Sequence, residues 1–144
     1  MRLSTRCRYG TRALIEIARN YRAGPTKRKD IARAQGLTAA YLENILGVLK
    51  SQRLVTSARG AGGGFALAKP PTSVTVLDIV LALEGSIAPV DCVEDAGACR
   101  RSPCCGARGA WKKLHDAQVK VLSEMTLADL VAMEAGKGDV DFAI

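Results

Sequence analysis

The sequence predicts a mainly α-helical fold with a small β-hairpin wing: a winged helix-turn-helix followed by a long C-terminal dimerisation helix. Two helical segments joined by a tight turn at Gly36 predict the helix-turn-helix. A glycine-rich hairpin directly after them predicts the wing. An apolar stripe on a long helical segment after residue 109 predicts a face that a second copy of the chain covers.

The first helix is expected over residues 5–21, where apolar side chains recur at three- and four-residue spacing and Ser4 is a suitable N-cap. Gly24-Pro25 interrupts this pattern. A short second helix is expected over residues 28–35, because Gly36 suits the left-handed conformation that closes a helix.

The third helix is expected to follow Thr38, its N-cap, and to run to about Ser51. Strands are expected at 54–58 and 65–67, joined by Arg59 and a glycine-rich tip. Glycines at such a tip allow close approach to a sugar–phosphate backbone. The alternative is a flexible turn that only requires positive φ, but the position after a helix-turn-helix favours a wing.

In the second half, Thr75 and Asp78 form a capping-box pattern that predicts a helix ending at about Glu84, before Gly85. Residues 86–107 lack periodicity and contain four of the five cysteines.

The long helix is expected to begin near Gly109, and a last short helix is expected from Thr126 to about Ala135. The predicted organisation is a winged helix-turn-helix lobe over 1–71, a segment with the cysteine loop and the dimerisation helices over 72–135, and a flexible tail over 136–144.

Positive charge is concentrated in the first half of the chain. The net charge is +7, yet residues 1–70 contain 14 lysines and arginines against 3 acids, whereas residues 71–144 contain 7 against 11. This asymmetry favours a first half that faces a polyanion such as double-stranded DNA.

The candidate DNA-reading side chains lie at the start of the third helix, before the second helix and on the wing. Glu43 is one of the few acids in the basic lobe; it could accept from the amino group of cytosine and would act on specificity more than on affinity. The candidates for DNA binding are Lys27, Arg28, Thr38, Tyr41, Glu43, Asn44, Arg59, Gly60 and Gly62.

Three cysteines, Cys92, Cys99 and Cys105, lie in the aperiodic segment with Cys104 beside the last. The spacing differs from the paired knuckles of zinc ribbons and from the tight run of bacterial ferredoxins. Thiolates on a flexible loop can hold iron or zinc, and polar neighbours argue against burial. Iron–sulfur ligation is the favoured interpretation; zinc and thiol or disulfide chemistry stay open.

Several classes are excluded or disfavoured. No run of about 18 apolar residues offers a membrane span, and no apolar stretch near the N-terminus resembles a signal peptide, so we expect a cytoplasmic protein without a membrane partner. One histidine and no acid–base or nucleophile constellation give little support for an enzyme.

From Met1 to about Leu130 the sequence resembles the winged-helix iron–sulfur regulators of the IscR/NsrR type. The resemblance implies a homodimer in which Cys92, Cys99 and Cys105 hold a [2Fe-2S] or [4Fe-4S] cluster that tunes binding to promoter DNA. The motifs that carry it are Arg8-Tyr9, Tyr41-Leu42-Glu43-Asn44, Arg59-Gly60 with Gly62-Gly63-Gly64, and Trp111, six residues after Cys105.

The chain departs from the family pattern at the fourth ligand. The positions that ligate in IscR-like and NsrR-like members are occupied here by Arg108 and Arg8. We expect Cys7 of the partner subunit's first helix to supply the fourth ligand, with Cys104 as the alternative. Glu94 and His115 are reserves.

The sequence thus predicts a homodimeric DNA-binding transcriptional regulator controlled by a cysteine-ligated iron–sulfur cluster. One alternative is a thiol or disulfide switch of the same fold without iron. The other is a small iron–sulfur electron carrier, which the basic lobe and wing disfavour.

Overall fold

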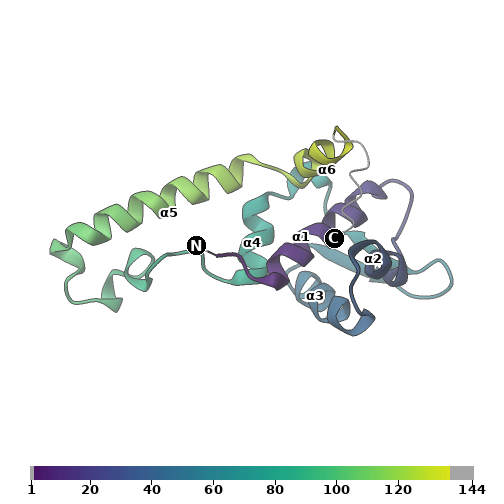
Figure 1. The fold of residues 1–144 in the computed structure, drawn as a ribbon, viewed down its shortest axis with the longest axis horizontal. Coiled ribbons are helices and arrows are strands. Elements are labelled where there is room, and N and C mark those ends of the chain that lie inside the picture. Colours follow the sequence, from purple (N-terminus) through teal and green to yellow (C-terminus); the bar gives the residue numbers. More distant parts are fainter. Residues whose placement is uncertain (1, 137–144) are drawn as a thin grey trace.

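The computed structural model describes residues 2–136, which form six α-helices and one two-stranded hairpin at one end of the molecule (Figure 1). The predicted fold class is confirmed. The helices are α1 (Thr5–Arg19), α2 (Arg28–Gln35), α3 (Ala39–Ser51), α4 (Val76–Glu84), α5 (Gly106–Glu124) and α6 (Leu127–Ala135); the strands are β1 (Val55–Ala58) and β2 (Gly64–Leu67).

The helix-turn-helix follows the predicted bounds closely. Ser4 and Thr38 cap α1 and α3 by accepting from backbone amides, and Gly36 closes α2 with a φ of 62°. Helix α1 ends at Arg19 rather than at residue 21, because Asn20 serves as its C-cap and the chain then turns towards α2.

The wing is an antiparallel hairpin in which Val55 pairs with Leu67 and Ala58 with Gly64. Leu54 precedes the first strand, and Gly64 belongs to the second, so each predicted strand start shifts by one residue. The base of the hairpin also pairs with the segment before α2: Thr26 and Phe65 exchange two backbone hydrogen bonds of 2.8 Å. The wing is therefore fixed to the helix-turn-helix.

The predicted capping box of Thr75 with Asp78 is present, and Thr126, predicted only as a helix start, forms a second capping box with Asp129. Helix α5 begins at Gly106, three residues earlier than predicted, because the Cys105 sulfur accepts from the backbone amide of Arg108 and serves as N-cap. The sequence has no conventional signal for a helix start here, because the N-cap is a cysteine and two of the first four helix residues are glycines.

One hydrophobic core joins both halves of the chain. Its members come from α1 to α4, both strands and the start of α6; the largest fully buried side chains include Leu14, Ile17, Leu46, Ile79 and Leu127. The core contains residues from both sides of the predicted domain boundary at residue 71. That boundary stays a prediction. The predicted tail, apart from Gly136, lies outside the described residues.

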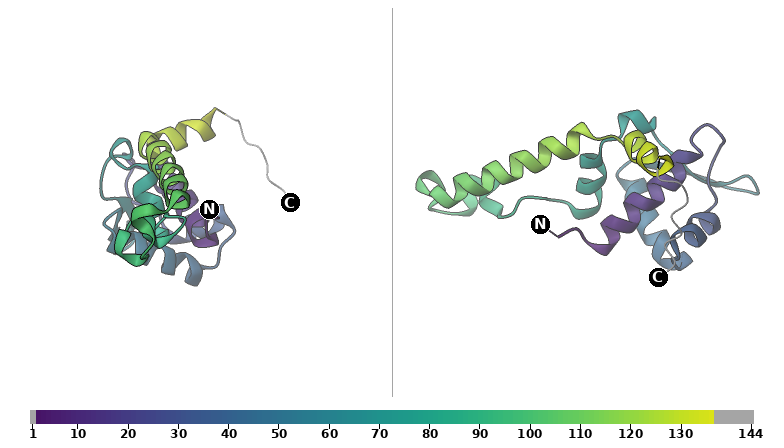
Figure 2. Two further views of the ribbon diagram at one scale, coloured as in Figure 1. Left: turned by 90° about the vertical axis from the view of Figure 1, so that its left-hand side faces the viewer. Right: turned by 45° about the horizontal axis from the view of Figure 1, so that its top comes forward.

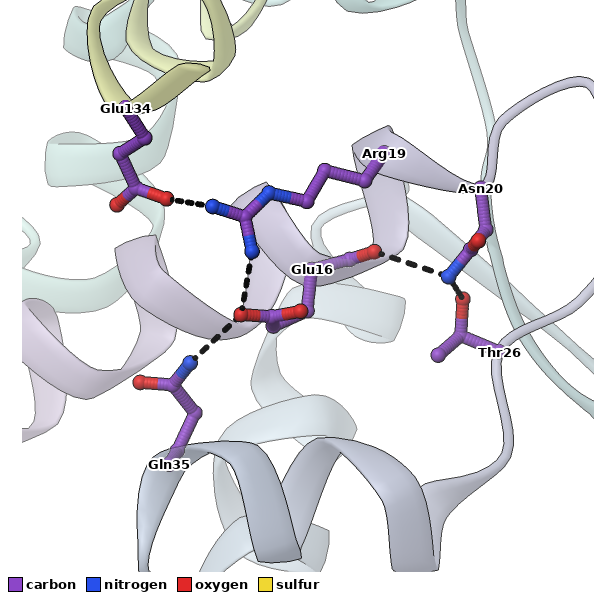
Figure 3. A network of polar contacts seen from close by, with 6 residues as sticks. All are labelled: Glu16, Arg19, Asn20, Thr26, Gln35 and Glu134. Carbon is purple, nitrogen blue, oxygen red and sulfur yellow. Dashed lines mark hydrogen bonds and ion pairs between the residues drawn. The ribbon is translucent and has the colours of Figure 1, made fainter. Parts of the chain in front are cut away.

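Helix α6 is held to α1 by a polar network that reaches α2 (Figure 3). Arg19 pairs with Glu134 of α6 and with Glu16, 3.1 Å away. Glu16 also accepts from the side-chain amide of Gln35 on α2 at 3.1 Å. These contacts link the C-terminal helix to the helix-turn-helix.

Helix α5 projects from the rest of the molecule and has no buried residue (Figures 1 and 2). On its apolar stripe Trp111 is 44% exposed, Leu114 43% and Val121 55%. The cysteine loop lies at its far end, and the hairpin lies at the opposite end of the molecule. Within residues 2–136, no helix combines the length and apolar character that crossing a bilayer requires.

Candidate DNA interface and cysteine loop

The wing and the helix-turn-helix enclose a groove of about 340 Å³. The groove is lined by Lys27 and Arg28 at the start of α2, by Glu43 of α3, and by the hairpin residues Ser57, Ala58, Gly60, Ala61, Gly63, Gly64 and Phe65. Lys50 at the end of α3 donates to the Ser57 hydroxyl at 2.7 Å, a link between α3 and the wing that the sequence did not reveal. The structure thus brings Lys27, Arg28 and Glu43 together with the wing, whereas Arg59 is exposed on the hairpin and does not line the groove.

Glu43 is paired in the free protein. Its Oε2 accepts from Arg28 Nη1 at 2.5 Å, and both side chains are about half exposed. An ion pair at this exposure contributes little to folding stability, so breaking it costs the fold little.

The other candidate residues at the start of α3 differ in whether they already make contacts within the protein. Asn44 is exposed. The Thr38 hydroxyl accepts from the Tyr41 amide at 3.3 Å, so it already has a structural role. The Tyr41 ring packs edge-on against Tyr9, with ring centroids 6.3 Å apart, which fixes its direction towards α1.

The wing glycines have separate roles. Gly60 has a φ of 95°, and a Cβ at Gly60 or Gly62 would meet no heavy atom within 4 Å. A Cβ at Gly63 would lie 2.4 Å from the Ala58 carbonyl oxygen, and one at Gly64 would lie 2.3 Å from that of Thr26. A side chain at Gly62 would thus lie in open space, whereas Gly60 is required by its positive φ and Gly63 and Gly64 by their close backbone contacts.

The cysteine loop consists of short 3-10 turns, Asp91–Val93, Ala96–Ala98 and Ser102–Cys104, between α4 and α5. Cys99 and Cys104 are exposed, Cys92 and Cys105 are partly buried, and all are free thiols. The predicted accessibility of the loop cysteines is therefore observed.

Arg108 organises the base of this loop. Its Nε donates to the Cys92 carbonyl oxygen at 2.6 Å, and its backbone amide donates to the Cys105 sulfur at 3.4 Å. Arg108 thereby joins the first and last cysteines of the spacing. This role was missed from sequence, where Arg108 was noted only as a residue that cannot ligate.

Accessible thiols on a loop match the donor chemistry of an iron–sulfur cluster. Within residues 2–136 of one chain, however, the structure gathers no three His, Cys, Asp or Glu side chains into metal-binding geometry. The thiols are suitable donors for such a cluster, but the loop would have to move to bring three of them together.

A family model described as an iron-dependent transcriptional regulator, Rrf2, matches residues 3–133. The chain belongs to the Rrf2 family. It is 42% identical to protein rrf2 of Nitratidesulfovibrio vulgaris over 131 residues, which cover 91% of this chain and 87% of that protein.

Solved structures agree with this assignment. The global cysteine regulator CymR of B. subtilis superposes with a TM-score of 0.78 at 38% identity, covering 92% of this chain and 98% of that one. IscR of T. potens gives 0.75 at 34% identity, covering 93% and 88%. These relatives are transcription regulators rather than enzymes, and so is this Rrf2 protein.

Cys7, the expected fourth ligand, is buried in the single chain. It is 1% exposed, on the face of α1 that packs against α4. Burial, reinforced by the nearby Glu84 carboxylate, raises the pKa of Cys7 to about 11 from 9.0. Ligation by Cys7 would require its thiol to become accessible and to lose its proton, and this role stays a prediction.

We expect Cys7 to resist alkylation by iodoacetamide at pH 8 while exposed Cys99 and Cys104 react, with peptide mass spectrometry identifying the modified residues. In denaturant all five cysteines should react alike. Rapid labelling of Cys7 in the native protein would contradict its burial.

The raised pKa of Cys7 also affects the free energy of unfolding. Since folding favours the neutral thiol, the burial of Cys7 contributes fully to stability below about pH 9, and this contribution is lost as the pH rises through about 11.

Proposed function

We propose that this Rrf2-family regulator binds promoter DNA through α3 and the wing, and that a thiolate-held iron–sulfur cluster on the loop controls this binding. The observation that carries the proposal is the presence, in one chain, of the groove between wing and helix-turn-helix and of four free thiols on the loop that continues α4. The family description as iron-dependent supports the choice of iron.

On DNA, the basic residues would contact phosphates and the start of α3 would contact base edges. Lys27, Arg28 and Arg59 provide charge, and Gly60 and Gly62 leave room for the backbone at the wing tip. When Arg28 turns to a phosphate, Glu43 is released to discriminate between bases. Asn44 and Tyr41 complete the α3 candidates, and Thr38 fixes the start of the helix.

In the loop, Cys92, Cys99 and Cys105 would hold the cluster, [2Fe-2S] or [4Fe-4S], with Cys104 as the alternative near the third position. The cluster, when bound, supplies a centre that responds to iron supply, redox change or nitric oxide. Arg108 would keep two of these cysteines together, because its Nε donates to the Cys92 carbonyl oxygen and its backbone amide donates to the Cys105 sulfur. The fourth ligand is expected to be Cys7 of a partner subunit, which would become available only after α1 of that subunit separates from α4.

We also propose a homodimer in which the exposed stripe of α5 is covered by a second copy. Solvent exposure of a tryptophan, a leucine and a valine on one helix is costly unless a partner covers them. A dimer would place two α3 helices on DNA, as winged-helix dimers require for two half-sites.

Val121→Asp should convert the dimer to a monomer without unfolding it, because Val121 is 55% exposed in the single chain and a buried carboxylate would oppose association. Light scattering with circular dichroism measures both properties. Lys120→Asp, one residue away and off the stripe, is the matched control. A dimeric Val121→Asp protein would exclude this face as the interface.

The test of function is a visible absorption spectrum with iron and sulfide analysis on anaerobically purified protein, followed by binding to DNA with and without the cluster. Absorption between roughly 320 and 460 nm with stoichiometric iron and sulfide is expected. A protein that stays colourless after reconstitution, yet whose DNA binding changes when its thiols are oxidised, would favour the second candidate, a thiol or disulfide switch. The similarity to a global cysteine regulator and the adjacent Cys104 and Cys105 favour that candidate.

An electron carrier would hold a cluster but would lack specific affinity for DNA. A steep fall of DNA affinity with salt would argue against it, because phosphate contacts release counterions. A promoter-binding regulator works where the chromosome is, and we therefore propose a cytoplasmic location.

A further inference from the structure

The last turn of α4 lies between the cysteine loop and α3. Gly85 closes α4 with a φ of 86°, and the loop begins at the next residue. The loop and the wing lie at opposite ends of the molecule (Figures 1 and 2). A change in the loop therefore has to pass through the elements between them, and α4 is the element that the loop continues.

Leu83 connects this turn to the DNA-reading helix. It is 1% exposed, and it fills a notch that α1 leaves at Gly10. A Cβ at Gly10 would lie 2.6 Å from Leu83 Cδ1 and 3.3 Å from Ile45 Cγ2. Leu83 of α4 and Ile45 of α3 thus reach the same notch, and Ile45 directly follows Asn44 in the sequence.

Polar contacts fix the same turn to the start of α1. The Ser4 amide donates to Glu84 Oε1 at 2.7 Å, and Arg6 Nη2 donates to the Leu83 carbonyl oxygen at 2.6 Å. The Glu84 carboxylate and the Leu83 carbonyl oxygen are thus both held by the start of α1.

We propose that the turn Leu83-Glu84-Gly85, the α4 joint, transmits the state of the cysteine loop to α3, with Leu83 and Glu84 as positioning residues. Close packing makes this transmission effective, because a shift of Leu83 in a filled notch displaces its neighbours. The inference rests on the proposed function, since it presupposes that the loop controls DNA binding.

Coupling between two sites is reciprocal, so DNA must also affect the loop. The experiment measures how fast the loop thiols of the reduced full-length protein react with DTNB, with and without a saturating duplex selected from a random-sequence library by the protein itself. Cys7 is buried and contributes only on unfolding. For the unmodified protein we expect DNA to change the rate by about fivefold or more.

Leu83→Ala and Glu84→Ala should bring the ratio of free to DNA-bound rates to within about twofold of one, although DNA still binds. Leu83→Met conserves the side-chain volume and should therefore keep the rate ratio of the unmodified protein. This variant can still be measured if Leu83→Ala folds poorly. Glu134→Gln is the matched control, because it breaks the Arg19 contact of α6 at the other end of α1.

A ratio that stays unchanged in both alanine variants would overturn the inference and leave the proposed function intact. A ratio of one in the unmodified protein would overturn both, because the loop would then be uncoupled from DNA. Loss of the ratio in Glu134→Gln as well would also overturn the assignment to the α4 joint.

Discussion

Gly63→Ala should lower the affinity for DNA by at least about tenfold while the helical core stays folded. The added Cβ would lie 2.4 Å from the Ala58 carbonyl oxygen, a backbone atom that cannot move aside as a side chain does. Relief would require the turn closed by the Gly63 amide and the Gly60 carbonyl to open, and the wing tip would change shape. Fluorescence anisotropy with a labelled duplex measures the affinity, and circular dichroism checks the fold.

Gly62→Ala leaves the shape of the hairpin unchanged, because a Cβ there would meet no heavy atom within 4 Å, so a loss of affinity in this variant reports the room that DNA requires at the tip. The two variants add the same methyl group to neighbouring residues of the same tip. An affinity equal to that of the unmodified protein in both variants would mean that the wing tip does not take part in binding.

Cys105→Ser should reduce the iron and sulfide content by more than about tenfold, because a serine hydroxyl is a poor substitute for a soft thiolate ligand. The same variant should keep α5 intact: the Cys105 sulfur caps the helix by accepting from the Arg108 amide, and serine is a favoured N-cap residue. The substitution thus separates the ligand role from the structural role. Iron analysis and visible absorption measure the first, and thermal unfolding measures the second.

Cys104→Ser provides the comparison at the adjacent position. Its sulfur is exposed and makes a 3.7 Å contact with the Arg101 carbonyl oxygen, so little structure depends on it. We expect it to retain iron. Loss of iron from Cys104→Ser but not from Cys105→Ser would exchange the two cysteines in the ligand set.

Several features could be predicted because their signals are local. Helix ends are specified by residues within one turn of each other at Gly36, at the capping box of Thr75, at Gly85 and at the N-cap Thr126, and all four ends occur as expected. The basic first half and the polar cysteine loop follow from composition in the same way.

Other features were not predicted correctly, because they depend on contacts between residues that are distant in the sequence. The start of α5 was placed late, since a cysteine N-cap and the Arg108 contact with Cys92, 16 residues earlier, have no local signature. The wing glycines look alike in sequence, yet only Gly63 and Gly64 are crowded, and for Gly64 the crowding comes from Thr26.

The sequence by itself determined the order of helices, the hairpin, the charge asymmetry and the accessible thiols, because caps, glycines and periodicity act over a few residues. Only the tertiary structure decided that Cys7 is a buried core residue, that Glu43 is paired with Arg28, and that α4 joins the loop to α3. The physical reason is that burial and pairing arise from side chains far apart in the chain, as in the contact of Ser4 with Glu84, 80 residues away.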